Sequence, residues 1–379
     1  MKPSENNYSG ILNIRDFGAT GDGQTNDAPA IQKAIDATKR GDVLLIPSGE
    51  YALSQRLVIS TPDLIVQGRG TLVPHGKMND YLIEFGKGPR SSVDFLRDSV
   101  GLRLVVESLR LNGMGQSRGV FFRGLYHCSF SNISIMRTNG TAARFHEVRE
   151  SDFYQMNINH STALGEPLMD LCYRFGGEKD PFGGGWQWLT GRVDGQNNIR
   201  FFGLNLVHST SEVYIDIGGD HPKPEMPHIC AWPARAIHFS GCQIHLTQGD
   251  WLRCSMDDPD GSELRSVDWD VHGLTLPEHQ TLVRIRSANS ISFSQCNFPT
   301  SGREKADTCI QLGDERCEAV DVSFHGCRLP HRPVFNAQNC KRISTHGCSL
   351  AIEPWRWQDS EKTFEELVHG PHAKAVSIQ

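Results

Sequence analysis

The sequence predicts an all-β protein built as a parallel β-helix, a solenoid of stacked coils. Three observations support this prediction. A short apolar motif recurs about every two dozen residues, each copy alternates as a β-strand does, and no helical period separates the copies. In such a solenoid each coil buries its apolar side chains against its neighbours.

The repeated motif has apolar residues at its first, third, sixth and eighth positions, and cysteine often takes the sixth. The first two lie on one face of a strand, and the step of three then requires a bend that turns both halves inward. The four shortest spacings between copies are 21 to 24 residues. A β-propeller blade needs about 40 to 50 residues and is therefore the less favoured fold. Copies begin at residues 104, 128, 151, 199, 237, 269, 291, 322 and 343.

Most copies are followed by a second short alternating run, which predicts two or three strands per coil. These runs lie at 213–217, 283–285, 310–312 and 334–335. A solenoid is not limited to a single compact core, so we expect one elongated domain over residues 1–379. Its expected parts are an N-terminal cap with the first coil (11–75), further coils (76–350) and a C-terminal cap (351–379).

The charge and hydropathy of the sequence limit the binding partners and the location to be expected. A net charge of −6 and a pI near 6.2 argue against nucleic acid or an acidic membrane surface as a partner. Neither an apolar signal core at the N-terminus nor a run of 18 apolar residues is found. We therefore expect a cytoplasmic or phage-virion protein, extracellular only if another export route serves it.

Five of the eleven cysteines occupy repeat positions, which predicts a ladder of buried thiols acting as small apolar residues. No Cys-x-x-Cys pair or Cys/His cluster with zinc spacing occurs. We expect no metal site and no cofactor, with calcium at the acidic turn 257–260 as the one ion to consider. The repeat cysteines are Cys128, Cys242, Cys296, Cys327 and Cys348.

Residues 11–75 contain the most specific sequence pattern of the chain. Asp27 can cap a helix with Pro29 in its first turn, and 43–46 is a buried strand followed by a turn. The text DFGATGDGQTNDAPAIQKAIDA, followed by VLLIPSGEY, resembles the N-terminal cap of the pectate-lyase-like right-handed parallel β-helix superfamily. The resemblance implies a right-handed solenoid whose first coil is covered by the helix. Polysaccharide hydrolases, lyases, epimerases and phage tailspikes share this cap, so it predicts the fold and not the chemistry.

Three consecutive coils carry insertions at the same turn, at residues 176–198, 218–235 and 254–267. Insertions at one turn of a solenoid stack on one edge and can build a wall or cleft. Aromatic rings pack on the C–H faces of sugars, and arginine hydrogen-bonds hydroxyl groups. The expected substrate-binding residues are Arg174, Trp186, Trp188, His221, Trp232 and Arg235.

Hydrolysis of a glycosidic bond requires two carboxylates across that bond. The expected catalytic pair is Asp194 and Asp216, with Asp220 in reserve. Arg174 and Asp216 each stand two residues before a Gly-Gly, which predicts that they stack on adjacent coils. This pair is either a surface salt bridge or a catalytic carboxylate with an arginine neighbour.

The most favoured function is therefore a glycoside hydrolase acting on a polysaccharide or oligosaccharide. A polysaccharide lyase is the alternative enzyme, in which Arg174, Arg235 and His221 would serve. A non-catalytic glycan-binding spike, as a homotrimer, is the alternative of another class. The Gly-His-Gly of polygalacturonases is absent, which argues against a pectin substrate, and His127 and His146 are expected to be structural.

Overall fold

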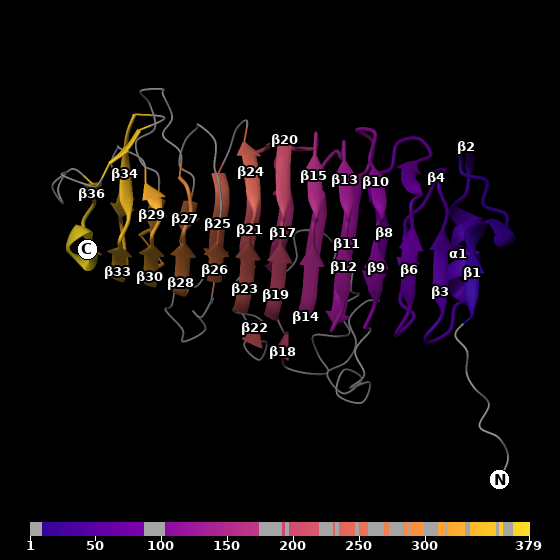
Figure 1. Cartoon of the computed structure of the whole chain (residues 1–379), viewed down its shortest axis with the longest axis horizontal. Helices are drawn as coiled ribbons and strands as arrows, with labels where there is room; N and C mark the ends of the chain where they lie inside the picture. The colour runs from indigo at the N-terminus through magenta and orange to yellow at the C-terminus, as the bar shows by residue number, and fades with distance from the viewer. Residues whose placement is uncertain are drawn as a thin grey trace, which may run out of the picture.

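The computed structural model is a long stack of β-strands (Figure 1). It runs from β1 (Ile11–Asn13) at one end to β37 (Val376–Ile378) at the other, and nearly all strand pairs are parallel. The expected all-β parallel β-helix is confirmed. The structure describes residues 10–86, 103–173, 192–193, 197–219, 230–231, 235–246, 250–256, 269–272, 283–286, 288–298, 310–315, 317–329, 334–353, 356–358 and 367–379.

Helix α1 (Ala28–Ala37) lies at the N-terminal end of the stack and packs on β4 and β5 (Figure 1). Proline stands in its first turn, as expected, and the helix buries Ile31 and Ala34. Asp27 is the N-cap residue, as predicted, but its side chain makes no capping hydrogen bond to the helix. Its buried carboxylate accepts hydrogen bonds from the backbone N–H groups of Thr20 and Gly21, at 2.7 and 3.0 Å, and so fixes the preceding loop.

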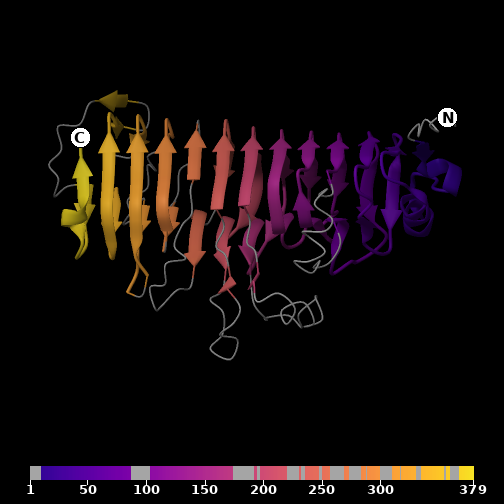
Figure 2. The ribbon, with the colours of Figure 1, turned by 90° about the horizontal axis from the view of Figure 1, so that it is seen from below.

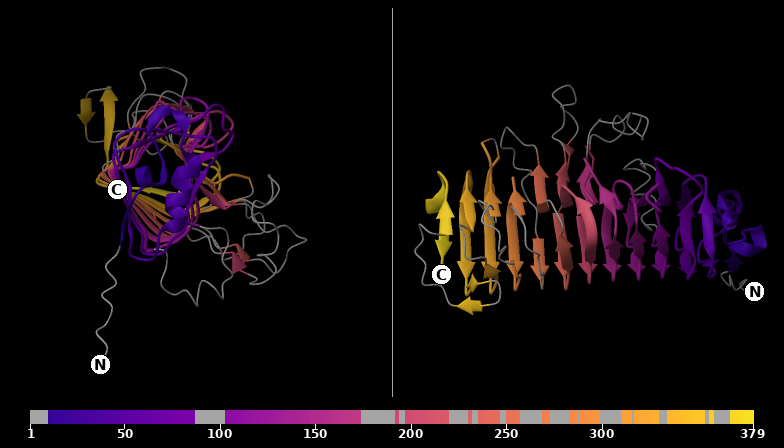
Figure 3. Two further views of the ribbon diagram at one scale, coloured as in Figure 1. Left: turned by 90° about the vertical axis from the view of Figure 1, so that its right-hand side faces the viewer. Right: turned by 90° about the horizontal axis from the view of Figure 1, so that it is seen from above.

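The coils have three faces, and strands of successive coils superimpose when the stack is viewed along its axis (Figure 3). Face 1 consists of β5 (Leu57–Ile59), β8 (Tyr81–Gly86), β11 (Arg118–Tyr126), the first half of β14 (Ala143–Tyr154), β17 (Met169–Tyr173), β21 (Val213–Gly219), β25 (Asp250–Met256), β27 (Val283–Ile285), β29 (Ile310–Leu312), β32 (Phe335–Ala337) and β36 (Val368–His369).

Face 2 follows along the chain after a corner in each coil. It consists of β1, β3 (Val43–Ile46), β6 (Ile65–Gly68), β9 (Val105–Glu107), β12 (Ser129–Ser131), the second half of β14, β19 (Asn197–Phe202), β23 (Arg235–Ser240), β26 (Trp269–His272), β28 (Ala288–Ser294), β30 (Ala319–His325), β33 (Cys340–His346) and β37. Its strands lie side by side along the stack (Figure 2).

Face 3 is a separate sheet. It consists of β2 (Asp22–Asn26), β4 (Glu50–Leu53), β7 (Thr71–Pro74), β10 (Arg110–Asn112), β13 (Ser134–Met136), β15 (Asn157–Asn159), β16 (Thr162–Ala163), β20 (Asn205–Ser211) and β24 (Gln243–Leu246). The remaining elements are the 3-10 helices η1 (Ile14–Phe17) and η2 (Ala373–Ala375) and the strands β18 (Arg192–Val193), β22 (Cys230–Ala231), β31 (Arg328–Leu329), β34 (Ser349–Glu353) and β35 (Arg356–Gln358).

The repeat predicted from the sequence sets the register of face 2. The pairings align Ser151 with Ile199 and Ile237, and Trp269 with Ile291 and beyond, so that the predicted starting positions follow one another up the stack. The third motif position fills the interior with stacked rings. Phe201 lies 5.1 Å from Phe153 and 4.9 Å from Phe239, measured between ring centroids.

The bend predicted inside the motif is confirmed. In each of eight copies the residue before the third apolar position has a positive φ, which turns the chain sharply from face 2 to face 3. Glycine is the residue that adopts this conformation without steric penalty, and four copies use it. The eight residues are Ser108, Asn132, Gln155, Gly203, Gly241, Gln295, Gly326 and Gly347.

Two of the expected insertions touch one another where the structure describes them. Strands β18 and β22 pair in parallel, joining Arg192 to Cys230 and Val193 to Ala231. The expected C-terminal cap (351–379) lies partly outside the described residues, which end in β36, η2 and β37. Eight cysteines of the described ranges are free thiols, and seven of these are buried. No helix in the described ranges is long and apolar enough to cross a membrane.

Candidate functional site

Most of the residues expected to form the site lie outside the described residues. This holds for Arg174, Trp186, Trp188, Asp194, Asp220, His221 and Trp232, and for the acidic turn 257–260. Arg235 begins β23, but its side chain is also outside the description. Asp216 is the one predicted residue whose surroundings can be given.

Asp216 lies on β21, and its predicted alignment with Arg174 is wrong. In the parallel register Asp216 is opposite Asp170 of β17, while Gly218 is opposite Cys172. The alignment based on the two Gly-Gly pairs differs from this register by four residues, since it placed Arg174 and not Asp170 opposite Asp216. The buried alternation decides the register instead, because Met169 and Leu171 stack inside on Ile215 and Ile217. Asp216 therefore has a second carboxylate as its neighbour on β17.

The outward positions of face 1 form a row that we call the charged row. Each member lies between two buried apolar residues of its strand, so its side chain points away from the coil interior. The members are opposite one another on successive strands. They are Glu84, Phe121, Arg144, Asp170, Asp216, Arg253 and Arg284.

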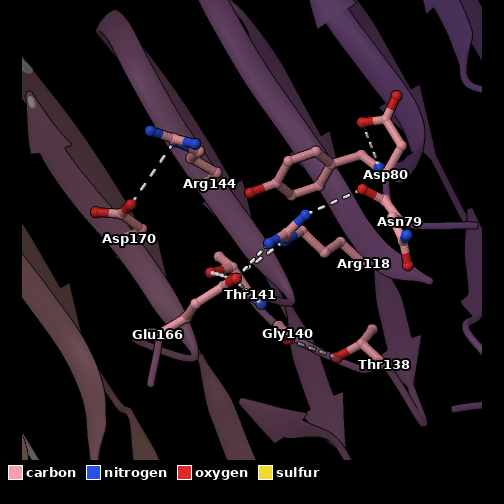
Figure 4. Close-up of polar contacts among 10 residues, drawn as sticks. Asn79, Asp80, Arg118, Thr138, Gly140, Thr141, Arg144, Glu166 and Asp170 are labelled. Atoms are coloured by element: carbon pink, nitrogen blue, oxygen red, sulfur yellow. Dashed lines mark hydrogen bonds and ion pairs between the residues drawn. The ribbon is translucent and has the colours of Figure 1, made fainter. Parts of the chain in front are cut away.

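Two ion pairs occupy the middle of the charged row. The Arg144 guanidinium lies 3.6 Å from the Asp170 carboxylate (Figure 4), and Arg253 donates to Asp216. The carboxylates are inaccessible, with 7% and 0% of the side chain exposed, whereas the arginines are 28% and 35% exposed. The exposed atoms of these two ion pairs therefore belong mainly to the arginines.

A buried histidine lies beside the row. His146 follows Arg144 by two residues on β14, is opposite Arg123 of β11, and stacks on Phe121 at 6.4 Å. Burial, together with the charges of Arg144 and Arg123, holds the pKa of His146 well below its usual value. Its imidazole is therefore neutral at physiological pH, which is the form that accepts a proton.

Arg123 has a buried partner of its own. The Arg123 guanidinium lies 3.4 Å from Glu84, which also pairs with Arg56 at 3.3 Å. Tyr81, on the same strand as Glu84, is nearly buried and packs on Phe121 with ring centroids 5.4 Å apart. Burial raises the pKa of the Tyr81 phenol, so its hydroxyl keeps its proton.

One edge of the row is held by a cluster of polar contacts across coils (Figure 4). Glu166 accepts from the Arg118 guanidinium and from the backbone N–H and hydroxyl of Thr141, at 3.1 and 2.9 Å. Arg118 also donates to the Asn79 carbonyl at 3.1 Å. Burial alone would raise the pKa of Glu166, but these bonds outweigh it and lower that pKa to about 2. The cluster fixes the segment that leads into Asp170.

Among the described residues no group of three or more His, Cys, Asp or Glu side chains is arranged to hold a metal ion. The groups assembled here are guanidinium donors, a neutral imidazole, a protonated phenol and two neighbouring carboxylates. Such groups can bind an anionic ligand, accept a proton and donate one. Sequence reasoning missed Tyr81, Arg123, Arg144 and Asp170 and treated His146 as structural. One signal was available in the sequence. A polar residue that stands between two apolar residues of a strand can be buried when that strand pairs in a parallel sheet.

Comparisons with known proteins agree with this architecture. Residues 11–84 match the family model described as rhamnogalacturonase A/epimerase, pectate lyase-like. Alginate lyase 7 of Azotobacter vinelandii is 41% identical over 211 residues, which cover 53% of this chain and 24% of that protein. Depolymerase 1, capsule K30/K69-specific, of Klebsiella phage K5-2 is 33% identical over 144 residues, which cover 34% of this chain and 18% of that protein.

The chain spans about a quarter or less of the length of these two relatives. Among solved structures, PfbA, a surface adhesin of Streptococcus pneumoniae, superimposes with a TM-score of 0.53 at 10% identity. The match covers 97% of this chain and 92% of the adhesin, which shows a shared fold. The chain therefore has the fold of the pectate-lyase-like parallel β-helix proteins, and its N-terminal segment carries the sequence of that group.

Proposed function

We propose that the protein cleaves an acidic polysaccharide bound along face 1, by β-elimination. The observation that carries this proposal is the arrangement of the charged row, in which the carboxylates of Asp170 and Asp216 are buried and the side chains of Arg144 and Arg253 are partly exposed. Guanidinium groups bind carboxylates in two-point contacts. The relatives named alginate lyase and capsule-specific depolymerase support a polysaccharide substrate.

β-Elimination on a uronate needs three contributions. A cation must neutralise the uronate carboxylate, a base must take the adjacent proton, and an acid must protonate the leaving oxygen. Arg144 would neutralise the carboxylate, His146 would take the proton and Tyr81 would donate one. The lowered pKa keeps the imidazole of His146 neutral and the raised pKa keeps the hydroxyl of Tyr81 protonated, which are the starting states of a base and an acid.

The test is a screen against alginate and polygalacturonate as acidic polymers and dextran as a neutral one. Each reaction is followed by reducing ends and by the ultraviolet absorbance of unsaturated uronates. We expect both signals on an acidic polymer and neither on dextran. His146→Gln should lower kcat at least about 100-fold, since general base catalysis contributes that much or more.

The matched control is His208→Gln, because His208 is an exposed histidine that stacks on His160 away from the charged row. This control should keep the parent activity. Equal cleavage of dextran, or full activity of His146→Gln, would contradict the proposal.

Hydrolysis is the second candidate, and one observation favours it. Asp170 and Asp216 are directly opposite on neighbouring parallel strands, which lie about 4.8 Å apart. Retaining glycosidases hold their two carboxyl groups about 5 to 5.5 Å apart. Reducing ends without ultraviolet absorbance, abolished by Asp216→Asn, would establish this candidate in place of elimination. Either enzyme would act outside the cell or on a virion, in keeping with the phage relative.

A further inference from the structure

A pair of stacked aromatic rings is exposed on face 2, round the corner of the coil from the charged row. Tyr154 ends β14 and Phe202 ends β19, and the register places them opposite one another. Their centroids are 5.0 Å apart, and their planes differ by 10°. The side chains are 40% and 36% exposed. The two neighbouring rings form a contiguous apolar patch, and exposed apolar patches can mark binding sites.

The ring faces look along the stack, because the two rings are nearly parallel and their centroids are separated by about one strand spacing. One face of each ring therefore covers the other ring, and the outer faces look toward the next coils. On the side of Tyr154 the next residue in the row is Ser131, and the one after it is Glu107. Ser131 is the smallest of these three residues, and the positions of Tyr154 and Glu107 on either side of it are two strand spacings apart, roughly 9.6 Å. We call the position over Ser131 the notch.

Polar groups surround this notch. Glu107 is exposed and accepts from Gln67 at 3.0 Å, which leaves further lone pairs on its carboxylate. Two residues before Tyr154 on β14, Asp152 accepts from both the Nε and an Nη atom of the partly exposed Arg200 of β19. A flat apolar surface with charged hydrogen-bonding groups at its border suits a ring that has one C–H face and a rim of hydroxyl groups.

A protein partner suits the patch less well. Two aromatic side chains bury at most about 500 Å², and a stable interface needs about 800 Å² from each partner. The described neighbours in the row, Glu107, Ser131 and Ser240, are polar and extend no apolar surface. The geometry fits a single ring.

We infer that the notch over Ser131 is a secondary binding site in which a sugar ring of a polysaccharide stacks on the outer face of Tyr154. Phe202 supports the other face of Tyr154 and keeps it upright. The site is remote from the charged row, since Tyr154 follows Arg144 by ten residues and the strand turns a corner at Glu150, where φ is 45°. It would hold polymer without taking part in cleavage. The inference rests on the proposed function only for the choice of a polysaccharide as ligand.

The test uses affinity electrophoresis of the full chain in native gels that contain alginate, polygalacturonate or dextran. The parent should be retarded by at least one polymer. Ser131→Leu fills the notch and should weaken that retardation about tenfold in apparent Kd, while turnover of short fragments stays unchanged. Ser294→Leu is the matched control, because Ser294 lies on the same outward row three strands beyond Phe202. It should behave as the parent.

Tyr154→Ala and Tyr154→Phe provide an independent pair in case Ser131→Leu disturbs folding, which the melting temperature would reveal. Tyr154→Ala should lose the retardation, and Tyr154→Phe should keep it because the ring remains. Equal retardation of the parent, Ser131→Leu and Tyr154→Ala would overturn the inference, as would a parent that no polymer retards. A change of oligomeric state by light scattering, with unchanged retardation, would instead assign the patch to a subunit interface. Notch-dependent retardation without any cleavage would uphold the inference and reject the proposed function.

Discussion

Face 1 and face 2 are built by the same coils, and strand β14 runs through both, yet their outward positions differ. On face 1 the outward row buries Glu84, Asp170 and Asp216. On face 2 the corresponding positions of β14 and β19 hold Asp152 and Arg200, an ion pair that is 23% and 40% exposed. Burying a charge is unfavourable unless it is paired, and the solenoid does not require it. Burial of the carboxylates on face 1 is therefore a cost in folding free energy that the fold does not require, and such costs are typical of functional sites.

The interior that both faces share sets the scale for this comparison. Phe201→Ala removes a ring stacked between two others, and we expect it to lower the free energy of unfolding by about 3 to 5 kcal/mol. Phe202→Ala changes the next residue, whose side chain points outward on face 2, and should lower it by less than about 1 kcal/mol. Urea unfolding measures both. Equal losses would mean that the inward and outward assignments are incorrect.

The two faces should respond differently to loss of a carboxylate. Asp216→Asn removes the buried partner of Arg253 and should lower the free energy of unfolding by about 3 kcal/mol, near the low end for buried pairs because Arg253 can reach water. Asp152→Asn breaks the exposed pair on face 2 and should lower it by about 0.5 kcal/mol. Urea unfolding at pH 7 tests the pair, and similar values for the two variants would remove the contrast on which the site rests.

Glu166 gives the smallest effect and sharpens the comparison through pH. Its pKa falls from the model-compound value of 4.5 to about 2 in the folded chain. A depressed folded pKa contributes stability above about pH 4.5, and that contribution is lost as pH falls toward 2. The melting temperature of the parent should therefore drop more steeply over this range than that of Glu166→Gln. Parallel curves for the two proteins would show that the contacts of Arg118 and Thr141 do not hold the carboxylate ionised.

The sequence was sufficient for the fold because the fold repeats. The spacing of apolar residues located the strands of face 2, and the step of three located the turn that Asn132 and Gly203 make with positive φ. The same reasoning could not place Asp216 correctly. A long stretch of chain separates β17 from β21, and its length does not show which residues of the two strands are opposite one another. Only the buried neighbours Ile215 and Ile217 fix that register, and two glycines suggested another.

The candidate site was harder to predict than the fold for a second reason. An outward polar residue in a strand, such as Asp170 or Arg144, is indistinguishable in sequence from a solvated one such as Asp152. Its burial depends on segments far away in the chain. His146 illustrates the problem, because its neutral state results from burial and from two arginines, one of them on another strand.

The most direct test of the central claim is a crystal structure of the inactive His146→Gln variant with an oligosaccharide from whichever acidic polymer the parent cleaves. The account predicts a sugar carboxylate within about 2.7 to 2.9 Å of the guanidinium of Arg144 or Arg253. An oligosaccharide bound elsewhere, with both arginines in contact only with Asp170 and Asp216, would contradict the assignment of face 1 as the active face.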